Sequence, residues 1–294
     1  MPMVHSEKAA GSETLLTVTD YDLNATLSSG QAFGWRFRDM GWESVIGDRW
    51  VRLRAQPQGI HAVTPELPTD WDWLHRYLQC EVILEEILRT FPADAPMESS
   101  IAACRGLRLL RQDPWECLAS FILSSTKQIV QIQQIHQLLS ERYGKEVIVP
   151  HGRAPAYSFP SADRLASATE AELRNCKMGF RAPNLLGAAR AVAEGKLKLE
   201  PLREMALETA REQLCLLRGV GPKIANCVLL FAYGFPTAFP VDVWVLKAIQ
   251  NLYFPRRRAS RRRLETFVRT HFGPHSGYAQ QYLFHYMRTS ARHG

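Results

Sequence analysis

Two charged residues occupy positions in which they could do chemistry. Lys223 directly follows the turn formed by Gly219, Val, Gly221 and Pro222, and Asp242 directly precedes the apolar segment VWVLKAI. The glycines permit backbone angles that other residues resist, and proline suits the first turn of a helix. Lys223 is therefore expected in a first helical turn, where the helix dipole disfavours a positive charge and eases loss of a proton. A neutral amine is what a nucleophile needs.

Each of these features also has an ordinary interpretation. Taken alone, the Gly-x-Gly turn is as well explained as a plain connection between two helices, and an isolated lysine is more often a solvated surface residue. The exposed amides of the turn and the positive end of the next helix would nevertheless suit a DNA phosphate, without sequence preference. Asp242 is well placed as a helix N-cap, and a capped carboxylate stays ionised and could stabilise a developing cation.

The elements around these residues change in type along the chain. Segments 14–18, 24–37, 43–56 and 59–63 are short, rich in Val, Thr, Phe and Trp, and predict the strands of a small antiparallel sheet. From Trp71 onward, apolar residues recur at helical spacing. The predicted helical segments are 71–91, 114–125, 129–144, 182–195, 206–219, 222–234, 242–254 and 276–291.

This order predicts an α+β fold. A small antiparallel β-sheet domain with flanking helices is expected at 1–111, followed by an all-α domain at 112–294 that contains a helix-hairpin-helix at about 206–233.

The bulk composition narrows the class of protein. The 294 residues include 36 Lys and Arg against 29 Asp and Glu, a net charge of +7 that favours polyanionic partners without identifying one. The first thirty residues contain no long apolar run, so neither a signal peptide nor a membrane span is expected, and we expect a soluble intracellular protein. None of the six cysteines forms a C-x2-C pair, which argues against a zinc or iron–sulfur site.

Several ordered motifs resemble one family. The lysine after the glycine turn, followed by Pro-Val-Asp, is similar to the helix-hairpin-helix DNA glycosylases that use a catalytic lysine. The segments LSSGQAFGWR at 27–36, QDPWECLASFILSS at 112–125, MGFRA at 178–182 and YAQQYLF at 278–284 resemble 8-oxoguanine DNA glycosylases in particular. The likeness spans roughly residues 14 to 288, and five ordered matches are far more specific than any single one.

The resemblance implies a bifunctional glycosylase and AP lyase of base excision repair. Lys223 would attack C1′ of the damaged nucleotide and form a Schiff base, giving base excision and a slower β-elimination. Asp242 would stabilise the cationic sugar and help to orient the amine. Excision of formamidopyrimidines is left open.

The resemblance also assigns a base pocket. Cys227 and Phe284 would hold the flipped base between them, Gln280 would read its Watson–Crick edge, and the carbonyl of Gly30 would accept the N7 hydrogen of 8-oxoguanine. The spacing agrees with this assignment, because residues four apart share one helix face, as Lys223 and Cys227 do. Taken singly, Cys227 and Phe284 are more typical of a core, and Gln280 of a surface.

The motifs that face the opposite strand depart from the family pattern. By resemblance, Phe180 would wedge into the duplex and Arg181 would address the orphaned cytosine. The family's Asn-Asn-Asn is here Thr-Lys-Gln, so that Thr126 replaces an asparagine that contacts that cytosine, and Gln131 replaces a second cytosine-reading arginine. With one of three readers left, we expect weaker discrimination of the opposite base. Trp244 stands where the family has histidine, in a form that resembles the bacterial branch.

The expected partner is double-stranded DNA that contains oxidised guanine, bound by a monomer without cofactor, metal or membrane. The expected location is DNA-associated, in a bacterial cytoplasm and nucleoid or in a nucleus. Three other functions remain open at this point. One is a related glycosylase for alkylated purines, which typically keeps the aspartate and lacks the lysine. A second is a helix-hairpin-helix DNA-binding module without chemistry. A third is a protein with a role unrelated to DNA, whose basic charge is coincidental.

Overall fold

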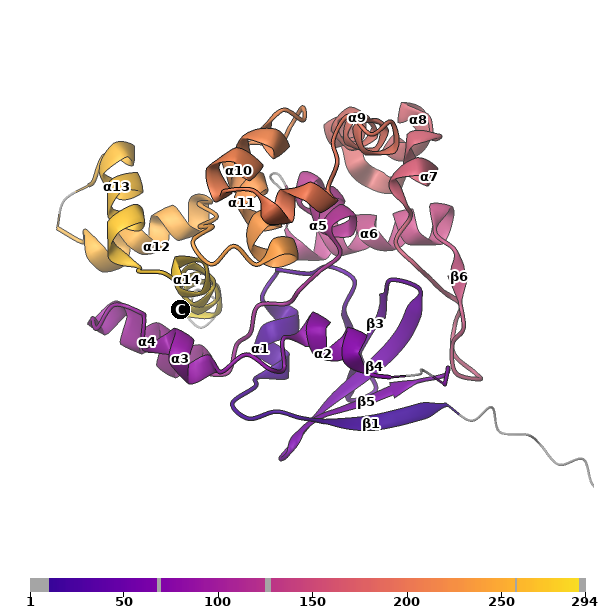
Figure 1. Ribbon diagram of the computed structural model, residues 1–294, viewed down its shortest axis with the longest axis horizontal. Helices are drawn as coiled ribbons and strands as arrows, with labels where there is room; N and C mark the ends of the chain where they lie inside the picture. The colour runs from indigo at the N-terminus through magenta and orange to yellow at the C-terminus, as the bar shows by residue number, and fades with distance from the viewer. Residues whose placement is uncertain (1–10, 68–69, 125–127, 257, 291–294) are drawn as a thin grey trace, which may run out of the picture.

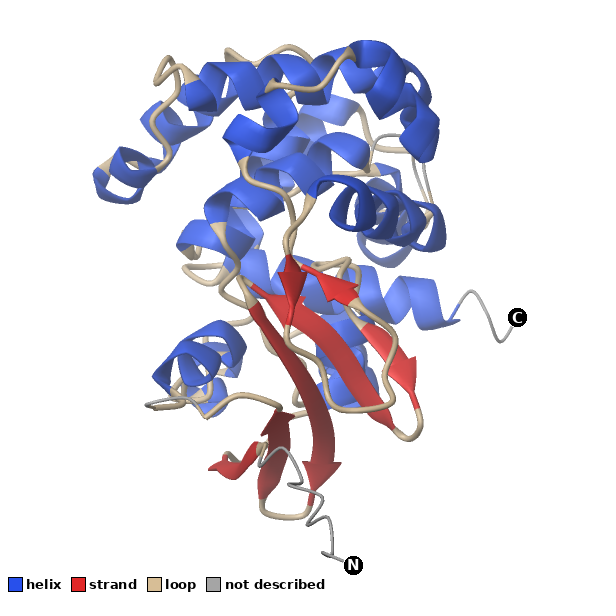
Figure 2. Ribbon diagram, turned by 90° about the vertical axis from the view of Figure 1, so that its right-hand side faces the viewer, coloured by secondary structure: helices blue, strands red, loops and turns tan. Residues whose placement is uncertain are grey.

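The computed structural model describes residues 11–67, 70–124, 128–256 and 258–290. It consists of a five-stranded antiparallel sheet followed by a larger helical part, and the sheet lies against one side of the helices (Figures 1 and 2). The strand order is β1-β5-β4-β3-β2. The strands are β1 (Ser12–Thr17), β2 (Arg36–Arg38), β3 (Gly41–Ile46), β4 (Arg49–Gln56) and β5 (Gly59–Thr64). The α+β fold class expected from the sequence is therefore confirmed.

One face of the sheet carries the fully buried residues of β4 and β5, which follows from the period of two along a strand. In β4, Val51 and Leu53 are fully buried, whereas Arg54 on the opposite face is exposed. Leu53 pairs with Ala62 of β5, which is also fully buried. These residues form an apolar core of their own beneath the sheet.

The strand predicted at 24–37 is wrong for most of its length. Residues Leu23–Ser28 form helix α1, and only Arg36–Arg38 is a strand. Asp22 caps this helix by accepting a hydrogen bond from the Ala25 amide at 2.8 Å. Residues 29–35 then form a loop, because buried Gln31 bonds the chain to its neighbours in place of a strand ladder.

The helices predicted from apolar periodicity are confirmed, with segment 71–91 divided into two. The α-helices that follow the sheet are α2 (Asp72–Leu78), α3 (Leu84–Leu88), α4 (Ala95–Cys104), α5 (Pro114–Leu123), α6 (Ile129–Tyr143), α7 (Ala162–Ala166), α8 (Glu170–Leu173), α9 (Ala182–Ala193), α10 (Leu207–Cys215), α11 (Pro222–Val228), α12 (Val243–Tyr253), α13 (Arg261–His271) and α14 (Ser276–Ser290). A small hairpin of β6 (Glu146–Val147) and β7 (Ala156–Tyr157) follows α6. Further turns are the π-helices Arg174–Met178 and Leu229–Tyr233 and the 3-10 helices Gly179–Arg181 and Glu200–Glu204.

The main apolar core lies among the helices and includes α4 packed against α14. Residues of α3 and α4 contribute to it although they precede residue 111, as do Ala25 and Phe33. The segment around residues 25–33 therefore connects the sheet to the helical core.

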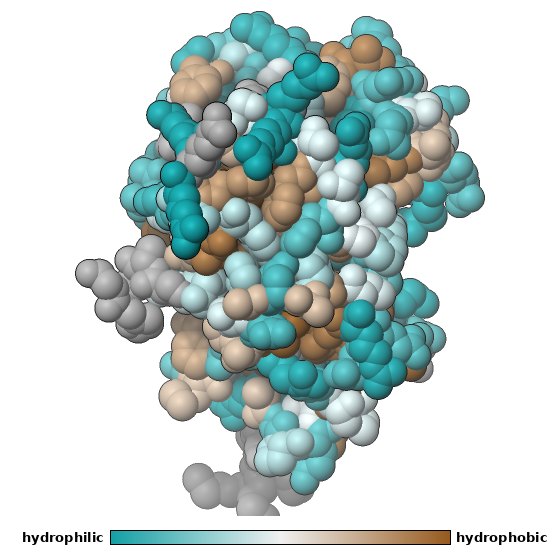
Figure 3. All heavy atoms as spheres, turned by 90° about the vertical axis from the view of Figure 1, so that its left-hand side faces the viewer, coloured by the Kyte–Doolittle hydropathy of each residue, from teal (hydrophilic) through white to brown (hydrophobic). Residues whose placement is uncertain are grey.

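The face shown in Figure 3 carries separate hydrophobic patches among hydrophilic side chains. Within the described part of the chain, every helix is too short or too polar to cross a bilayer.

Candidate active site

Lys223 lies in the first turn of α11, as expected from the glycine turn and Pro222. Its side chain is half-buried, and Nζ donates a hydrogen bond to Ser124 Oγ at 3.2 Å. Nζ also lies 5.4 Å from the centre of the Phe121 ring. Both contacts come from the end of α5, so the amine is held at a fixed place between two helices.

The two glycines of the turn play different structural roles. Gly219 has φ of +83°, and a Cβ there would lie 2.3 Å from the side-chain nitrogen of Asn184. Gly221 has φ of −101°, which any residue adopts, and a Cβ there would meet nothing within 4 Å. The expectation of unusual backbone angles thus holds for Gly219 and is wrong for Gly221. Gly221 leaves open space at the beginning of α11.

Asp242 is the N-cap of α12, as its sequence position predicts. Its carboxylate accepts a hydrogen bond from the Val245 amide at 2.8 Å. The segment leading to it is tied to α11, because the Asn226 side chain donates to the Phe239 carbonyl at 3.0 Å. The beginnings of α11 and α12 are therefore held in a fixed relation.

Cys227 is buried one turn after Lys223. Burial raises the pKa of its thiol to about 11, while the nearby Lys223 ammonium acts to lower that pKa and the Asp242 carboxylate acts to raise it. Lys223, Cys227 and Asp242 are thus close enough to interact electrostatically. The thiol is neutral at physiological pH and presents a small apolar surface.

Gln280 and Phe284 share one face of α14. Gln280 is 4% exposed, and its Oε1 has no hydrogen-bond partner among the described residues. A buried, unpaired amide oxygen costs free energy unless a ligand or water satisfies it. Phe284 is half-buried, with the Arg288 guanidinium carbon 5.8 Å from its ring centre.

Gly30 lies beside α14, near Arg288. It has φ of +83°, and a Cβ there would lie 2.6 Å from Ile129 Cδ1 and 3.6 Å from an Arg288 nitrogen. Arg288 donates a hydrogen bond to the Ser28 carbonyl, and Gln281 donates to the Ser29 carbonyl at 3.3 Å. Gly30 is therefore fixed next to the helix that carries Gln280 and Phe284.

Gln31 anchors this segment from the buried side. Its Nε2 donates to the Thr26 and Arg108 carbonyls at 3.0 and 2.8 Å, and its Oε1 accepts from the Leu110 amide at 2.8 Å. Two residues later, Phe33 packs edge-on against Phe121, with ring centres 5.5 Å apart. Because Phe121 also contacts Lys223, these rings connect the Gly30 segment to the amine.

Phe180 and Arg181 reverse the usual preference for apolar burial. Phe180 is 61% exposed, whereas Arg181 is 4% exposed and its guanidinium carbon lies 4.2 Å from the Phe180 ring centre. Burial lowers the pKa of Arg181. The pair immediately precedes α9, whose Asn184 packs against Gly219. An exposed aromatic ring is thus presented close to the helix-hairpin-helix turn.

Three positions depart from the family pattern, and the structure describes two of them, Gln131 in α6 and Trp244 in α12. Thr126 lies outside the described residues. Gln131 is exposed, and its Oε1 accepts a hydrogen bond from the Gln128 amide at 3.1 Å, as part of a capping box. Trp244 is 41% exposed in the first turn of α12.

Sequence reasoning missed several residues that hold this site. Ser124, Gln31 and Arg288 were given no role, although the first two lie inside the motifs that carry the resemblance. Ser124 and Arg288 contact partners about a hundred or more residues away in the chain, so their roles cannot be inferred from local sequence spacing. Within the described residues, no group of three or more His, Cys, Asp and Glu side chains could hold a metal ion.

Two family models cover most of the chain. Residues 14–118 match the N-terminal domain of 8-oxoguanine DNA glycosylase, and residues 119–273 match the HhH-GPD superfamily of base excision DNA repair proteins. The N-glycosylase/DNA lyase OGG1 of Arabidopsis thaliana is 32% identical over 288 residues, which span 92% of this chain and 78% of that protein. The yeast Saccharomyces cerevisiae N-glycosylase/DNA lyase is 31% identical over 61% of this chain and 50% of its own length.

The fold agrees with these matches. The 8-oxoguanine glycosylase/lyase of Clostridium acetobutylicum, solved with double-stranded DNA containing cytosine opposite 8-oxoguanine, superposes with a TM-score of 0.87 at 29% identity. The superposition covers 96% of this chain and 98% of that one. From its sequence, its two matched domains and its fold, the chain belongs to the 8-oxoguanine DNA glycosylase family of helix-hairpin-helix base excision repair enzymes.

Proposed function

We propose that this DNA glycosylase and AP lyase excises 8-oxoguanine from duplex DNA by attack of Lys223 on the damaged nucleotide. One observation carries the proposal. Lys223 Nζ is held by Ser124 in the first turn of α11, on the same helix face as Cys227. Lys223 and Asp242 both lie close enough to Cys227 to shift the pKa of its thiol. A nucleophile, a fixed carboxylate and a pocket wall are thereby combined at one place.

The chemistry follows from these positions. The neutral amine of Lys223 forms a bond to C1′ as the glycosidic bond breaks, and the base leaves with the bonding electrons and takes up a proton. The carboxylate of Asp242 faces the positive charge that develops on the sugar and lowers its energy. Loss of a proton from the amine and opening of the sugar ring give a Schiff base. Removal of a C2′ proton then expels the 3′-phosphate, which is the lyase step.

The base pocket is proposed to use the side chains around α14. The unpartnered Gln280 Oε1 would accept a hydrogen bond from the edge of an extruded base. Cys227 and Phe284 would provide the apolar walls. The Gly30 carbonyl would accept the N7 hydrogen that guanine lacks, and the Gln31 network supports this by fixing the segment.

The hairpin and the exposed ring are proposed to contact the duplex. The open space at Gly221 would let a phosphate approach the amides that begin α11. The exposed Phe180 would insert into the stack, and its withdrawal from Arg181 would release that guanidinium toward the orphaned base. Because Gln131 is engaged in a capping box, we expect weak preference for cytosine as the opposite base.

Borohydride trapping on a duplex with one 8-oxoguanine opposite cytosine tests the central step. The wild-type protein should give a covalent adduct, and Lys223→Gln should give none. Lys198→Gln is the matched control, since Lys198 is an exposed lysine.

The outcomes separate the alternatives. Base release without an adduct in the wild type would mean that water is the nucleophile. Neither adduct nor release, with intact duplex binding, would point to another lesion or to a binding module. Repeating the assay with a duplex that carries an alkylated purine distinguishes those two.

A further inference from the structure

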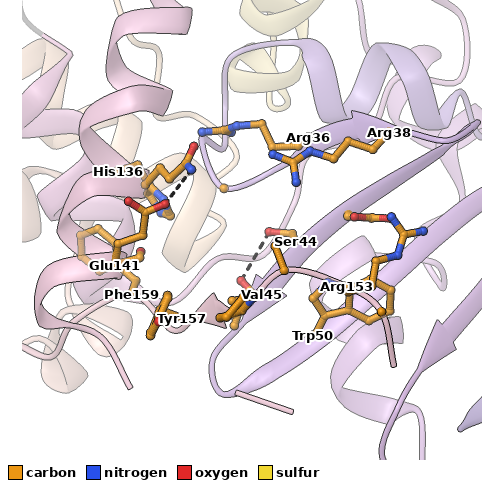
Figure 4. Close-up of a pocket in the computed structure, with 18 residues that line it drawn as sticks. Arg36, Arg38, Ser44, Val45, Trp50, His136, Glu141, Arg153, Tyr157 and Phe159 are labelled. Carbon is orange, nitrogen blue, oxygen red and sulfur yellow. Dashed lines mark hydrogen bonds and ion pairs between the residues drawn. The ribbon is translucent and has the colours of Figure 1, made fainter. Parts of the chain in front are cut away.

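A cavity lies between the sheet and the later turns of α6. Its volume is about 290 Å³. Strands β2, β3 and β4 line one side, and α6 and the segment that includes β7 line the other (Figure 4). None of its lining residues is among the groups assigned above to the nucleophile, the base pocket or the wedge.

Two arginines of β2 place positive charge at one end of this cavity. In Figure 4, Arg36 and Arg38 lie together at its upper end. The Arg36 guanidinium donates hydrogen bonds only to backbone carbonyls, those of Phe33, Trp35 and Gln133, at 2.8, 2.9 and 2.6 Å. Neither arginine has a carboxylate partner among the described residues.

The carboxylates that line the cavity have partners other than Arg36 and Arg38. Glu43 is paired with Arg153 at 3.2 Å and with Arg52 at 3.6 Å. Glu141 accepts a hydrogen bond from Gln137 at 2.7 Å. Burial lowers the pKa of Arg36 to about 10, with the neighbouring Arg38 adding to the effect, so the Arg36 guanidinium stays charged at neutral pH. An anion at this end of the cavity would offset the cost of burying that charge.

The opposite end of the cavity is aromatic. Trp50 and Tyr157 lie at the lower end in Figure 4, and Phe159 completes the wall beside α6. Trp50 is buried, whereas Tyr157 and Phe159 are half-buried. Such a wall favours a flat apolar ring.

One buried hydroxyl that lines the cavity has no hydrogen-bond partner among the described residues. Ser140 is 7% exposed and lines the cavity, and its Oγ makes no hydrogen bond among the described residues. A serine in a helix ordinarily satisfies its hydroxyl on the carbonyl one turn before it. Its failure to do so here leaves a donor and acceptor available to a ligand.

We propose that this cavity binds a small anion that carries a flat aromatic ring, of the class and size of a nucleoside monophosphate. The anionic group would lie against Arg36 and Arg38, the ring against Trp50 and Tyr157, and a polar atom within reach of Ser140. The volume is near the lower limit of small-molecule sites, which suits one ring system with one anionic group. The binding joins the sheet to α6 and therefore stabilises the folded chain.

Calorimetric titration of the full chain with adenosine monophosphate tests this site, with adenosine and inorganic phosphate as comparison ligands. Adenosine monophosphate avoids the guanine recognition proposed for the active site. We expect one molecule bound per chain, with adenosine and phosphate each weaker by about tenfold or more, since each lacks one half of the contacts. Thermal unfolding should shift upward in the presence of adenosine monophosphate.

Variants locate the binding. Arg38→Gln changes an exposed side chain and should weaken binding by about tenfold, the size of one charge-assisted hydrogen bond. Ser140→Ala should weaken it less. Arg89→Gln, which changes the exposed arginine directly after α3, is the matched control, and Gln280→Ala should also bind as the wild type does.

Three results would overturn the proposal. The first is the absence of binding by the wild type. The second is that phosphate binds as tightly as the nucleotide, which would mean that the aromatic wall contributes nothing to binding. The third is binding that is lost in Gln280→Ala and retained in Arg38→Gln, which would place the nucleotide in the base pocket.

Discussion

The side of the molecule that would act on the damaged nucleotide and the side that would face its partner strand differ in how they are built. On the first side, Lys223, Asp242, Gln280 and Phe284 match the family motifs, and each is positioned by a second contact or by its place on a helix. On the second side, Gln131 stands where the family resemblance implies an arginine, and it belongs to the capping box that begins α6.

The difference reflects what each side must do. Attack on C1′ requires an amine and a carboxylate at particular places, and few other side chains can supply them. Reading an opposite base modulates the rate and can be weakened without losing the reaction. The catalytic side should therefore tolerate substitution much less than the opposite-strand side.

The largest expected effect is on the catalytic side. Asp242→Asn keeps the N-cap, because asparagine caps as well as aspartate, and removes the charge. Base release in a single turnover should fall by about 10²–10³-fold, with the melting temperature unchanged. Asp242→Ala should lose the same rate and also about 0.5–2 kcal/mol of stability. A fully active Asp242→Asn variant would show that Asp242 serves only as a helix cap. The catalytic side would then not be less tolerant of substitution than the opposite-strand side at this position.

The glycine turn, where the two sides meet, should show an effect of intermediate size. Gly219→Ala forces a side chain into a left-handed conformation and against Asn184, so it should lower the free energy of unfolding by about 1–2 kcal/mol or more. Gly221→Ala should leave stability within about 0.5 kcal/mol, because its backbone and surroundings accept a methyl group. Its affinity for duplex DNA should nevertheless fall. Unchanged affinity would mean that no phosphate approaches Gly221.

The opposite-strand side should respond to restoring the family residue. Gln131→Arg should raise the ratio of excision opposite cytosine to excision opposite adenine by roughly tenfold, the size of one base contact. Gln134→Arg adds the same charge at an exposed position of α6 and serves as the control. An equal change in both variants would indicate charge alone, and no change in either would show that this region does not read the base.

The smallest expected effect concerns the wall of the base pocket. The folded Cys227 thiol keeps its proton up to about pH 11, whereas an unfolded thiol loses it near pH 9. The contribution of Cys227 to stability is therefore present below pH 9 and is lost as pH rises from 9 to 11. The free energy of unfolding, measured with a chemical denaturant, should decrease less over that pH range for Cys227→Ala than for the wild type. If the free energies of unfolding of the two proteins fell equally with pH, water would reach the thiol.

Sequence alone predicted the helices well because their signals are local. Asp113 and Pro114 begin α5, and Asp242 begins α12, as their types and positions indicate. The strand at 24–37 failed because Asp22 and Gln31 form contacts that outweigh its β-rich composition. The open space at Gly221 and the contact between Lys223 and Ser124 depend on packing between distant segments, which spacing does not encode. The roles of the site residues came from the family resemblance, and the individual side chains would not have revealed them.

The hydrogen bonds from α14 to the Gly30 segment also have a consequence for folding during synthesis. Arg288 and Gln281 hold the carbonyls of Ser28 and Ser29, more than two hundred and fifty residues earlier in the chain. Contacts of such long sequence separation form late, because the intervening loop must close first. A growing chain can thus form its sheet and its hairpin before α14 holds the carbonyls of Ser28 and Ser29. We therefore expect a chain that ends before α14 to lack this support of the Gly30 segment, and with it the lesion selection proposed for Gly30.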